Sequence, residues 1–247
     1  MTVLHRMRKV ARRFGLDVQR ADSTGSARLG ALLRNREITC VLDVGANSGQ
    51  YARRLRRAGY AGEIRSFEPL PDAFSRLARR ASRDPRWQAE RVALGPRDGE
   101  TELHVSGNPG ATSSSILPML PRHRQAAPDA RYLRTIEVPI RRLDTIWHDV
   151  VPAGGVNFLK LDVQGFEVAA LDGASQSLGR VAGLQMEISL VPLYEGAPSL
   201  RDILNRTDAL GMHLVHLEPG FFDPHTRELL QVDGVFMRPH GPLPAPT

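Results

Sequence analysis

The segment that most constrains the fold runs from Val41 to Tyr51 and reads VLDVGANSGQY. An apolar run ends in an acid, Asp43, and continues through a glycine-bearing turn into a segment with helical character. In parallel α/β sheets this order marks the carboxyl end of the first strand, where a nucleotide-sized crevice opens. Gly45 and Gly49 are four residues apart, so the G-x-G-x-x-G dinucleotide fingerprint is absent, and no G-K-[ST] phosphate loop follows.

A second acid follows about one strand–helix unit later. Residues 63–68 predict a short strand that ends at Glu68, directly before Pro69. An acid at the tip of a second strand accepts hydrogen bonds from both ribose hydroxyls, which suits NAD as well as S-adenosylmethionine. A glycine turn with an acid and no phosphate cradle favours a ribose ligand with a cationic or zwitterionic tail, and S-adenosylmethionine is such a ligand.

Strand-like and helix-like segments alternate along most of the chain, which predicts a parallel sheet with right-handed crossovers. The expected strands are 38–44, 63–68, 87–94, 156–163, 181–190, 213–217 and 233–238, and the expected helices are 48–58, 72–81, 166–173 and 200–210. The last two strands are separated only by a loop, which predicts an antiparallel terminal hairpin. We therefore predict an α/β fold with a Rossmann-like, seven-stranded and mostly parallel sheet of the class I methyltransferase type.

The chain of 247 residues is most simply one domain. We predict that this domain covers 26–240, after a basic amphipathic segment at 1–25 and before a flexible, Pro-rich tail at 241–247. Residues 99–105 and 134–140 alternate with period two and predict an additional strand pair. The connection between them, 106–133, is longer than ordinary loops and is a candidate lid or substrate loop.

The formal net charge is +6, and of the 33 lysines and arginines only Lys9 and Lys160 are lysines. The basic N-terminal segment predicts either a helix docked on the domain or a peripheral contact with an acidic membrane surface. Arginines on the helices expected over 48–58 and 72–81 are interpreted as a solvated outer face. A single cysteine, Cys40, and no apolar run long enough to span a bilayer favour a cytoplasmic protein, with the inner membrane surface as the alternative location.

A third polar cluster lies in and after the strand expected over 156–163. Side chains alternate along a strand, so Lys160 and Asp162 project to the same face. Ionisable groups in an otherwise apolar strand are costly unless they are paired or used, which leaves open a structural ion pair and an active-site role. Gly165 permits a tight turn, and Glu167 begins the next helix.

Several motifs in this order resemble the FkbM-type family of S-adenosylmethionine-dependent methyltransferases, from about Cys40 to Arg238. The motifs are Asp43-Val-Gly-Ala-Asn-Ser-Gly49, Phe67-Glu68-Pro69, Ala93-Leu94-Gly95, Ser113-Ser114-Ser115, Leu143-Asp144, Lys160-Leu-Asp162-Val-Gln-Gly-Phe-Glu167, Met186-Glu187 and Asp233-Gly-Val-Phe236. The resemblance implies an O-methyltransferase that acts on hydroxyls of a sugar, a glycolipid or a related natural product. Phe166 departs from the family pattern, in which a small residue is common.

The resemblance also implies roles for individual residues. The cofactor-binding residues it implies are Asp43, Gly45, Asn47, Ser48, Gly49, Glu68, Ala93, Leu94 and Asp162. The candidate substrate-binding residues are Ser113, Ser114, His123, Lys160, Glu187 and Asp233. Methyl transfer from a sulfonium requires alignment of the acceptor oxygen and removal of its proton, and Asp162 is the first candidate base, with Glu187 second.

Other interpretations compete with this one. Asp162, Glu187 and Asp233 could supply oxygen ligands to a divalent metal, but no compact ligand motif favours it. An NAD-linked oxidoreductase would share the first two strands, and a non-catalytic module would bind S-adenosylmethionine or a membrane without turnover. No N-P-P-Y-like element follows the fourth strand, so a nucleic-acid substrate is not expected. The sequence leaves the acceptor and the oligomeric state open.

Overall fold

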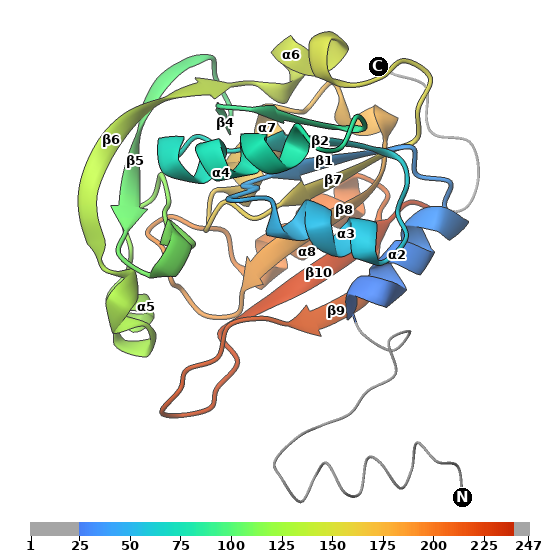
Figure 1. The fold of residues 1–247 in the computed structure, drawn as a ribbon. Helices are drawn as coiled ribbons and strands as arrows, with labels where there is room; N and C mark the ends of the chain where they lie inside the picture. Colours follow the sequence, from blue (N-terminus) through green and yellow to red (C-terminus); the bar gives the residue numbers. More distant parts are fainter. Residues whose placement is uncertain (1–24, 240–247) are drawn as a thin grey trace, which may run out of the picture.

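The structure is a computed structural model that describes residues 25–239, and a seven-stranded sheet forms its centre (Figure 1). The strand order is β3-β2-β1-β7-β8-β10-β9. The strands are β1 (Cys40–Val44), β2 (Glu63–Phe67), β3 (Trp87–Glu90), β7 (Asn157–Leu161), β8 (Val181–Ser189), β9 (His213–Pro219) and β10 (Gln231–Met237). The first five strands in this order are parallel, whereas β10 runs antiparallel to both β8 and β9. The predicted α/β fold with an antiparallel terminal pair is confirmed.

Helices cover both faces of this sheet. The helices are α2 (Gly25–Asn35), α3 (Gln50–Arg57), α4 (Pro71–Ala81), α6 (Leu143–Val150), α7 (Glu167–Asp172) and α8 (Leu200–Ala209). Buried side chains of α2, α3 and α4 pack in one core cluster, and those of α6, α7 and α8 pack in another. Strand β1 is buried along its whole length because both faces are covered, which accounts for its continuous apolar run.

The structure corrects the strand predicted over 87–94. This segment divides into β3, which pairs with β2, and β4 (Ala93–Leu94), which leaves the main sheet. β4 joins β5 (Gly99–Ser106) and β6 (Tyr132–Arg141) in a three-stranded sheet of order β4-β6-β5. The predicted strand pair at 99–105 and 134–140 is the antiparallel β5–β6 pair.

The long connection between β5 and β6 has secondary structure of its own. It contains two 3₁₀ turns, η2 (Pro109–Ala111) and η3 (Pro128–Ala130), and the short helix α5 (Pro121–Ala126). An isolated bridge joins Ser115 to His104 of β5, and another joins Met119 to Tyr194. The connection is therefore folded against the sheet and against the segment after β8.

Two predictions fall partly or wholly outside the described residues. The basic segment at 1–25 and the tail at 241–247 lie there, except for Gly25, where α2 begins. Across residues 25–239, every helix is too short or too polar to cross a bilayer.

The carboxyl ends of β1 and β7 approach each other closely. Gly45 follows β1 with a φ of 71°, and a Cβ atom at this position would lie 1.9 Å from the carbonyl oxygen of Asp162. Only glycine combines that backbone conformation with so close an approach. Gly45 thus permits the turn after β1 to lie directly against the end of β7.

Candidate active site

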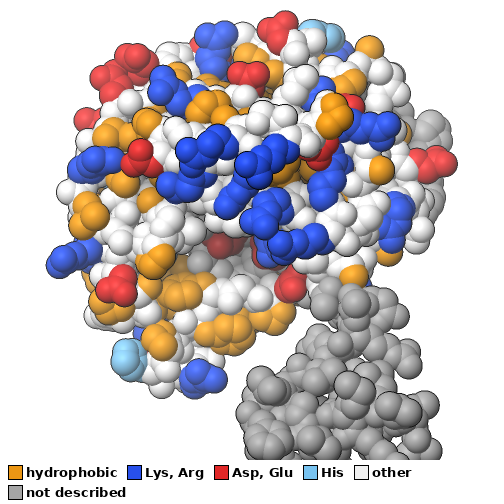
Figure 2. Space-filling model, viewed as in Figure 1, with side chains coloured by type: hydrophobic (Ala, Val, Ile, Leu, Met, Phe, Trp, Pro, Cys, Tyr) orange, Lys and Arg blue, Asp and Glu red, His pale blue; other side chains and the backbone are white. Residues whose placement is uncertain are grey.

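A cavity of about 340 Å³ opens at the carboxyl ends of β1, β2 and β7. Figure 2 shows a hollow on one face of the molecule, with acidic side chains in its depth and basic side chains over α3 and α4 above it. Its lining comes from the turn after β1, from α3, from the end of β2, from β4 and from residues 111–116 and 160–166. Its size is within the range of small-molecule sites, and it lies where ligands bind in open α/β sheets.

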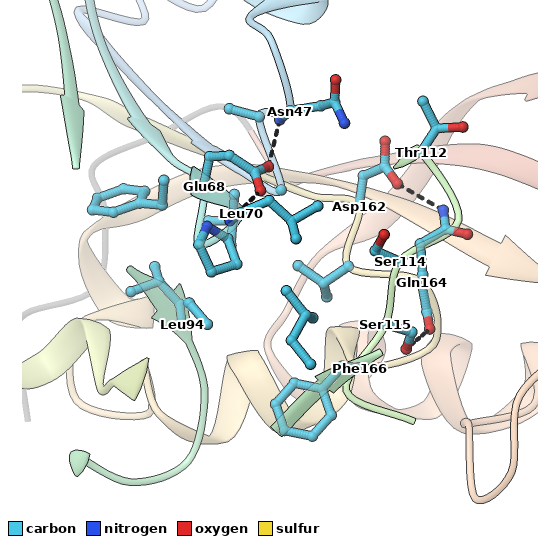
Figure 3. Close-up of a pocket in the computed structure, with 18 of the residues that line it drawn as sticks. Asn47, Glu68, Leu70, Leu94, Thr112, Ser114, Ser115, Asp162, Gln164 and Phe166 are labelled. Atoms are coloured by element: carbon cyan, nitrogen blue, oxygen red, sulfur yellow. Dashed lines mark hydrogen bonds between the residues drawn. The ribbon is translucent and has the colours of Figure 1, made fainter. Parts of the chain in front are cut away.

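Glu68 forms one end of the cavity wall (Figure 3). Its Oε2 accepts a hydrogen bond from the backbone N–H of Asn47 at 2.7 Å, and its Oε1 accepts one from the backbone N–H of Leu70 at 2.8 Å. Burial raises the pKa of Glu68 to about 7, although the two N–H donors oppose this. Both carboxylate oxygens keep lone pairs for further donors, such as a pair of ribose hydroxyls.

Apolar side chains line the cavity beside Glu68. They come from the end of β2, from β4, from β5 and from the segments 111–116 and 163–166: Phe67, Leu70, Val92, Leu94, Leu103, Ile116 and Phe166. Figure 3 shows Leu94 and Phe166 on the side of the cavity away from Asp162. A flat, largely apolar group such as an adenine ring would fill this part by burying apolar surface.

Lys160 connects the ends of β1 and β7 beneath the cavity. Its Nζ lies 3.1 Å from Oδ1 of Asp43 and 3.4 Å from Oδ2 of Asp162. It also donates to the backbone carbonyls of Val44 and Gly45 at 3.3 and 3.2 Å. Burial disfavours the charge of Lys160, but the carboxylates of Asp43 and Asp162 outweigh it and raise its pKa above the usual value.

Asp43 and Asp162 differ in exposure although both contact Lys160. The side chain of Asp43 is 0% exposed, whereas that of Asp162 is 39% exposed and lines the cavity. Asp43 also accepts a hydrogen bond from Ser66 Oγ at 3.4 Å. Asp43 therefore acts on the cavity through Lys160, while Asp162 is able to meet a ligand directly.

A chain of amide and carboxyl groups extends from Asp162 across the ends of β8 and β10. Gln164 Nε2 donates to Oδ1 of Asp162 at 3.1 Å and to Oε2 of Glu187 at 2.7 Å. Gln231 Nε2 donates to the same Glu187 oxygen at 2.7 Å. Glu187 and Asp233 lie opposite each other in the β8–β10 register.

The pKa values of two of these acids are raised. For Glu187 the causes are burial and then the charges of Asp162, Glu167 and Asp233, and its pKa lies well above the usual value. For Asp233 burial and then Asp162 raise the pKa to about 6. Acids with raised pKa values close to one another are typical of functional sites, where a proton is shared or transferred.

The side chain of Glu167 contacts the backbone of the turn after β7. Its Oε1 accepts hydrogen bonds from the backbone N–H groups of Val163 and Gly165 at 3.0 and 3.2 Å. Gln164 and Gly165 both have positive φ, so this carboxyl group supports the turn after β7. Glu167 therefore positions Gln164, and it does not line the cavity.

The structure brings most of the predicted site residues to the cavity wall. Those that line it are Gly45, Asn47, Glu68, Ala93, Leu94, Ser114, Lys160 and Asp162. Seven others do not line it: Asp43, Ser48, Gly49, Ser113, His123, Glu187 and Asp233. Of these, Glu187 is joined to the wall by its hydrogen bond with Gln164, and Asp233 lines a neighbouring chamber.

Three of the predicted residues contact other parts of the protein rather than the cavity: Ser48, Gly49 and Ser113. Ser48 accepts from Arg80 of α4, and a Cβ on Gly49 would collide with the Trp87 ring. Ser113 Oγ accepts from Asn108 within the same connection. The helix predicted to begin at Ser48 begins at Gln50, so both Ser48 and Gly49 belong to the turn that precedes it.

His123 of α5 is buried among aromatic rings, away from the cavity. Its ring centroid lies 5.1 Å from that of Tyr194 and 5.3 Å from that of Phe221. Burial lowers its pKa to about 4, so the imidazole is neutral at ordinary pH. These contacts favour a packing role for His123.

Several residues of the site had no signal in the sequence. Gln231 and Tyr51 match none of the motifs, and Gln164 lies within the Lys160–Glu167 motif without a predicted role. Gln164 and Gln231 nevertheless hold the acids in place. Tyr51 donates to Gln185 at 2.9 Å, and its ring lies 5.4 Å from the Lys160 ammonium. A period-two alternation of polar residues in β8 and β10 is the one pattern that could have pointed to Gln185 and Gln231.

A second chamber of about 210 Å³ adjoins the cavity. Tyr51 and Arg54 of α3 line both spaces, and Gln185, Glu218 and Asp233 line the chamber alone. Within residues 25–239, no group of three or more His, Cys, Asp or Glu side chains is arranged to hold a metal ion. The side chains that line the chamber offer several hydrogen-bond acceptors and the guanidinium group of Arg54.

Comparison with known proteins identifies related sequences. The model of the FkbM methyltransferase domain matches residues 43–214. The 2-O-methyltransferase NoeI of Sinorhizobium fredii is 29% identical over 169 residues, which cover 67% of this chain and 69% of that protein. Methyltransferase 1 of Beauveria bassiana is 27% identical over 142 residues, which cover 54% of this chain and 57% of that protein.

Solved structures resemble the chain more distantly. The magnesium protoporphyrin IX methyltransferase of Synechocystis PCC 6803, solved with bound S-adenosylmethionine, has a TM-score of 0.47 at 10% identity, and the match covers 97% of this chain and 85% of that one. A TehB-like S-adenosylmethionine-dependent methyltransferase of Corynebacterium glutamicum has a TM-score of 0.39 at 14% identity, with 96% of each chain covered.

Proposed function

Because the chain belongs to the FkbM methyltransferase family, we propose that it transfers a methyl group from S-adenosylmethionine to a hydroxyl of a sugar, a glycolipid or a related natural product. The single observation that carries the proposal is the cavity that contains Glu68 at one end and Asp162 at the other. A site for a nucleoside with a sulfonium tail needs a hydrogen-bond acceptor for the ribose hydroxyls. At the reacting end it needs a group that takes the proton of the hydroxyl to be methylated.

The cofactor half of the proposal uses the residues around Glu68. Its carboxylate would accept hydrogen bonds from the two ribose hydroxyls, and the apolar group that includes Leu94 and Phe166 would hold the adenine. The backbone around Gly45 and the exposed carboxylate of Asp162 would contact the methionine end. The absence of a phosphate loop in the turn after β1 agrees with a ligand that carries no phosphate.

The choice of a hydroxyl acceptor is supported by the polar groups at the ends of β8 and β10. Carboxyl and amide groups of Glu187, Gln231, Gln185 and Asp233 are suited to the hydroxyls of a sugar, which donate and accept hydrogen bonds. The name of the relative in Sinorhizobium fredii, a 2-O-methyltransferase, agrees with an oxygen acceptor.

In the proposed mechanism the protein aligns the acceptor oxygen with the methyl carbon and removes the hydroxyl proton. S-adenosylmethionine supplies an electrophilic methyl group when it is bound. Asp162 is the preferred base because its side chain is 39% exposed and lines the cavity, and Gln164 fixes its orientation. Glu187, whose pKa is raised, is the second candidate base.

The test separates cofactor, reaction and acceptor. Calorimetric titration with S-adenosylmethionine and with NAD is expected to give saturable binding of the first alone. Incubation of the protein with methyl-labelled S-adenosylmethionine and fractionated extracts should yield S-adenosylhomocysteine and a labelled methyl ether. Tighter binding of NAD, or label recovered only on nitrogen or carbon, would refute the proposed reaction.

A further inference from the structure

The outward side of α3 and α4 forms a basic surface beside the cavity. We call it the arginine surface and define it by Arg53 and Arg54 of α3 and Arg76, Arg79 and Arg80 of α4. Figure 2 shows basic side chains gathered over these two helices, directly above the hollow. The sequence alone predicts a solvated outer face for these helices.

The arginine surface has no salt-bridged acidic partner, whereas six other described arginines have one. Arg56, on another side of α3, pairs with Asp84 at 2.7 Å, Arg122 pairs with Asp223 at 3.0 Å, and Arg206 pairs with Asp172 at 2.7 Å. Among residues 25–239, no salt bridge includes a member of the arginine surface. Because other described arginines also lack a salt bridge, the feature that distinguishes this surface is the gathering of five of them on two helices directly above the cavity.

The guanidinium groups of this surface lie close enough to repel one another. The pKa of Arg80 is lowered by partial burial and then by the charges of Arg53, Arg76 and Arg79. Arg80 is held in this position by Ser48, whose backbone carbonyl and hydroxyl oxygens accept its hydrogen bonds. A bound anion would relieve the repulsion, and the planar guanidinium matches the geometry of phosphate.

Arg54 connects the arginine surface to the site. Its guanidinium lies 5.9 Å from the centre of the Tyr51 ring, and its side chain lines both the cavity and the adjoining chamber. The acceptor end of the site is acidic, with Asp162, Glu187 and Asp233 near one another. A negatively charged group would be repelled there, but it would be attracted to the surface outside.

We propose that the arginine surface binds a phosphate group carried by the methyl acceptor, while the hydroxyl to be methylated extends past Arg54 towards Asp162. The inference rests on the proposed function and narrows its acceptor to molecules with a phosphate or diphosphate. RNA also carries phosphate, but single-stranded RNA recognition uses exposed aromatic rings. Among the described residues, Phe222 is the one aromatic among the large exposed apolar side chains, and it lies in the β9–β10 loop.

The test measures binding of inorganic pyrophosphate to the full chain by calorimetry at low ionic strength. Removal of two charges in Arg53→Gln/Arg79→Gln should weaken binding by about tenfold or more. Arg201→Gln removes one exposed arginine of α8 on the opposite side of the sheet; it is the control for a change at a remote arginine and should bind as the unaltered protein does. Equal affinity in all three proteins, or no saturable binding in the unaltered one, would overturn the proposal.

The same three proteins are titrated with S-adenosylmethionine, whose affinity should be equal in all of them. If the unaltered protein does not bind S-adenosylmethionine, the proposed function is refuted. If it binds S-adenosylmethionine but not pyrophosphate, only the proposed role of the arginine surface is refuted. The basic N-terminal segment is present in all three proteins, so it cannot produce a difference between them.

Two further binding experiments distinguish the kind of molecule that carries the phosphate. Co-sedimentation with phosphatidylcholine vesicles that contain phosphatidylglycerol, if lost in Arg53→Gln/Arg79→Gln, assigns it to a lipid-borne acceptor. Pyrophosphate binding without vesicle binding assigns it to a soluble acceptor. A single-stranded RNA oligonucleotide that binds through the same arginines, and that pyrophosphate does not displace, would replace the proposal with a nucleic-acid partner.

Discussion

The two ends of the cavity are built in different ways. At the Glu68 end, the carboxylate is held by backbone N–H groups of Asn47 and Leu70, which follow β1 and β2 directly. At the Asp162 end, the carboxyl groups are held by the side-chain amides of Gln164 and Gln231 and by Lys160. One end is therefore fixed by backbone donors of two turns, and the other mainly by side-chain groups.

This difference suits a division of work between a constant ligand and a variable one. Backbone donors cannot be altered by substitution, so they suit a ligand as invariant as a ribose. Side-chain amides can be exchanged without changing the fold, so the end that meets the acceptor is open to adaptation. Lys160 joins both ends, since it contacts Asp43 and the Gly45 carbonyl on one side and Asp162 on the other.

The largest effect is expected for Asp162→Asn. The amide keeps the size of the side chain and its contact with Gln164 but cannot accept the hydroxyl proton, so turnover should fall about 10²–10⁴-fold. Release of S-adenosylhomocysteine with saturating acceptor measures this loss. Asp172→Asn, an exposed carboxylate that pairs with Arg206, is the control and should keep full turnover. If Asp162→Asn retains full turnover, Asp162 is not the base.

The junction between the two ends is tested by Lys160→Met. Methionine fills a similar volume but leaves the fully buried Asp43 without its cation, which should lower the free energy of unfolding by about 3–5 kcal/mol. Denaturant unfolding monitored by circular dichroism measures the change. Asp43→Asn in the same background should restore part of the loss, because it removes the unpaired charge. A loss below about 1 kcal/mol would mean that this ion pair does not hold the two ends together.

The same contrast explains how far the sequence could predict the site. Glu68 and Asp162 were predicted because each ends or directly follows a buried apolar strand, and a strand end has a local signature. Gln164 and Gln231 were not, because their role depends on the register between β8 and β10 and on the turn after β7. Gln231 also lies in no motif, and Gln164, although within the Lys160–Glu167 motif, is a neutral amide to which the sequence alone assigns no role.

The fold follows a similar rule. The strands of the main sheet and the helices α3, α4, α7 and α8 were predicted within a few residues, because their apolar periodicity is local. The break between β3 and β4 was missed, since β4 leaves the sheet to pair with β6, more than forty residues later. Helices α2 and α6 were not predicted either, and both are held by packing against the sheet.

The Glu68 end is tested by Glu68→Gln. The amide nitrogen would face one of the two backbone N–H donors, from Asn47 or Leu70, and the ribose would lose a charged acceptor. Affinity for S-adenosylmethionine should fall about 10–100-fold, the range of a hydrogen bond to a charged group. Calorimetric titration measures it, with Glu90→Gln at the exposed end of β3 as the control. Unchanged affinity would remove Glu68 from the cofactor site.

The smallest effect is a pH dependence that only the Glu68 end should produce in cofactor binding. Burial raises the pKa of Glu68 to about 7, so its carboxyl group gains charge as the pH rises through neutrality. The ionised form is the better acceptor for ribose hydroxyls, so affinity for S-adenosylmethionine should rise by up to about tenfold between roughly pH 6 and pH 8.

The titration of Glu68 changes stability in the opposite direction to cofactor affinity. Glu68 binds more protons in the folded protein than in the unfolded one between its ordinary pKa and about 7, so its contribution to the free energy of unfolding declines as the pH rises through that window. Glu167, whose pKa burial also raises to about 7, contributes in the same direction but does not line the cavity. Glu68→Gln should therefore flatten the pH dependence of cofactor affinity. The part of the pH dependence of the free energy of unfolding that Glu167 contributes should remain. A cofactor affinity that still rises with pH in Glu68→Gln would assign the titration to the acids at the Asp162 end instead.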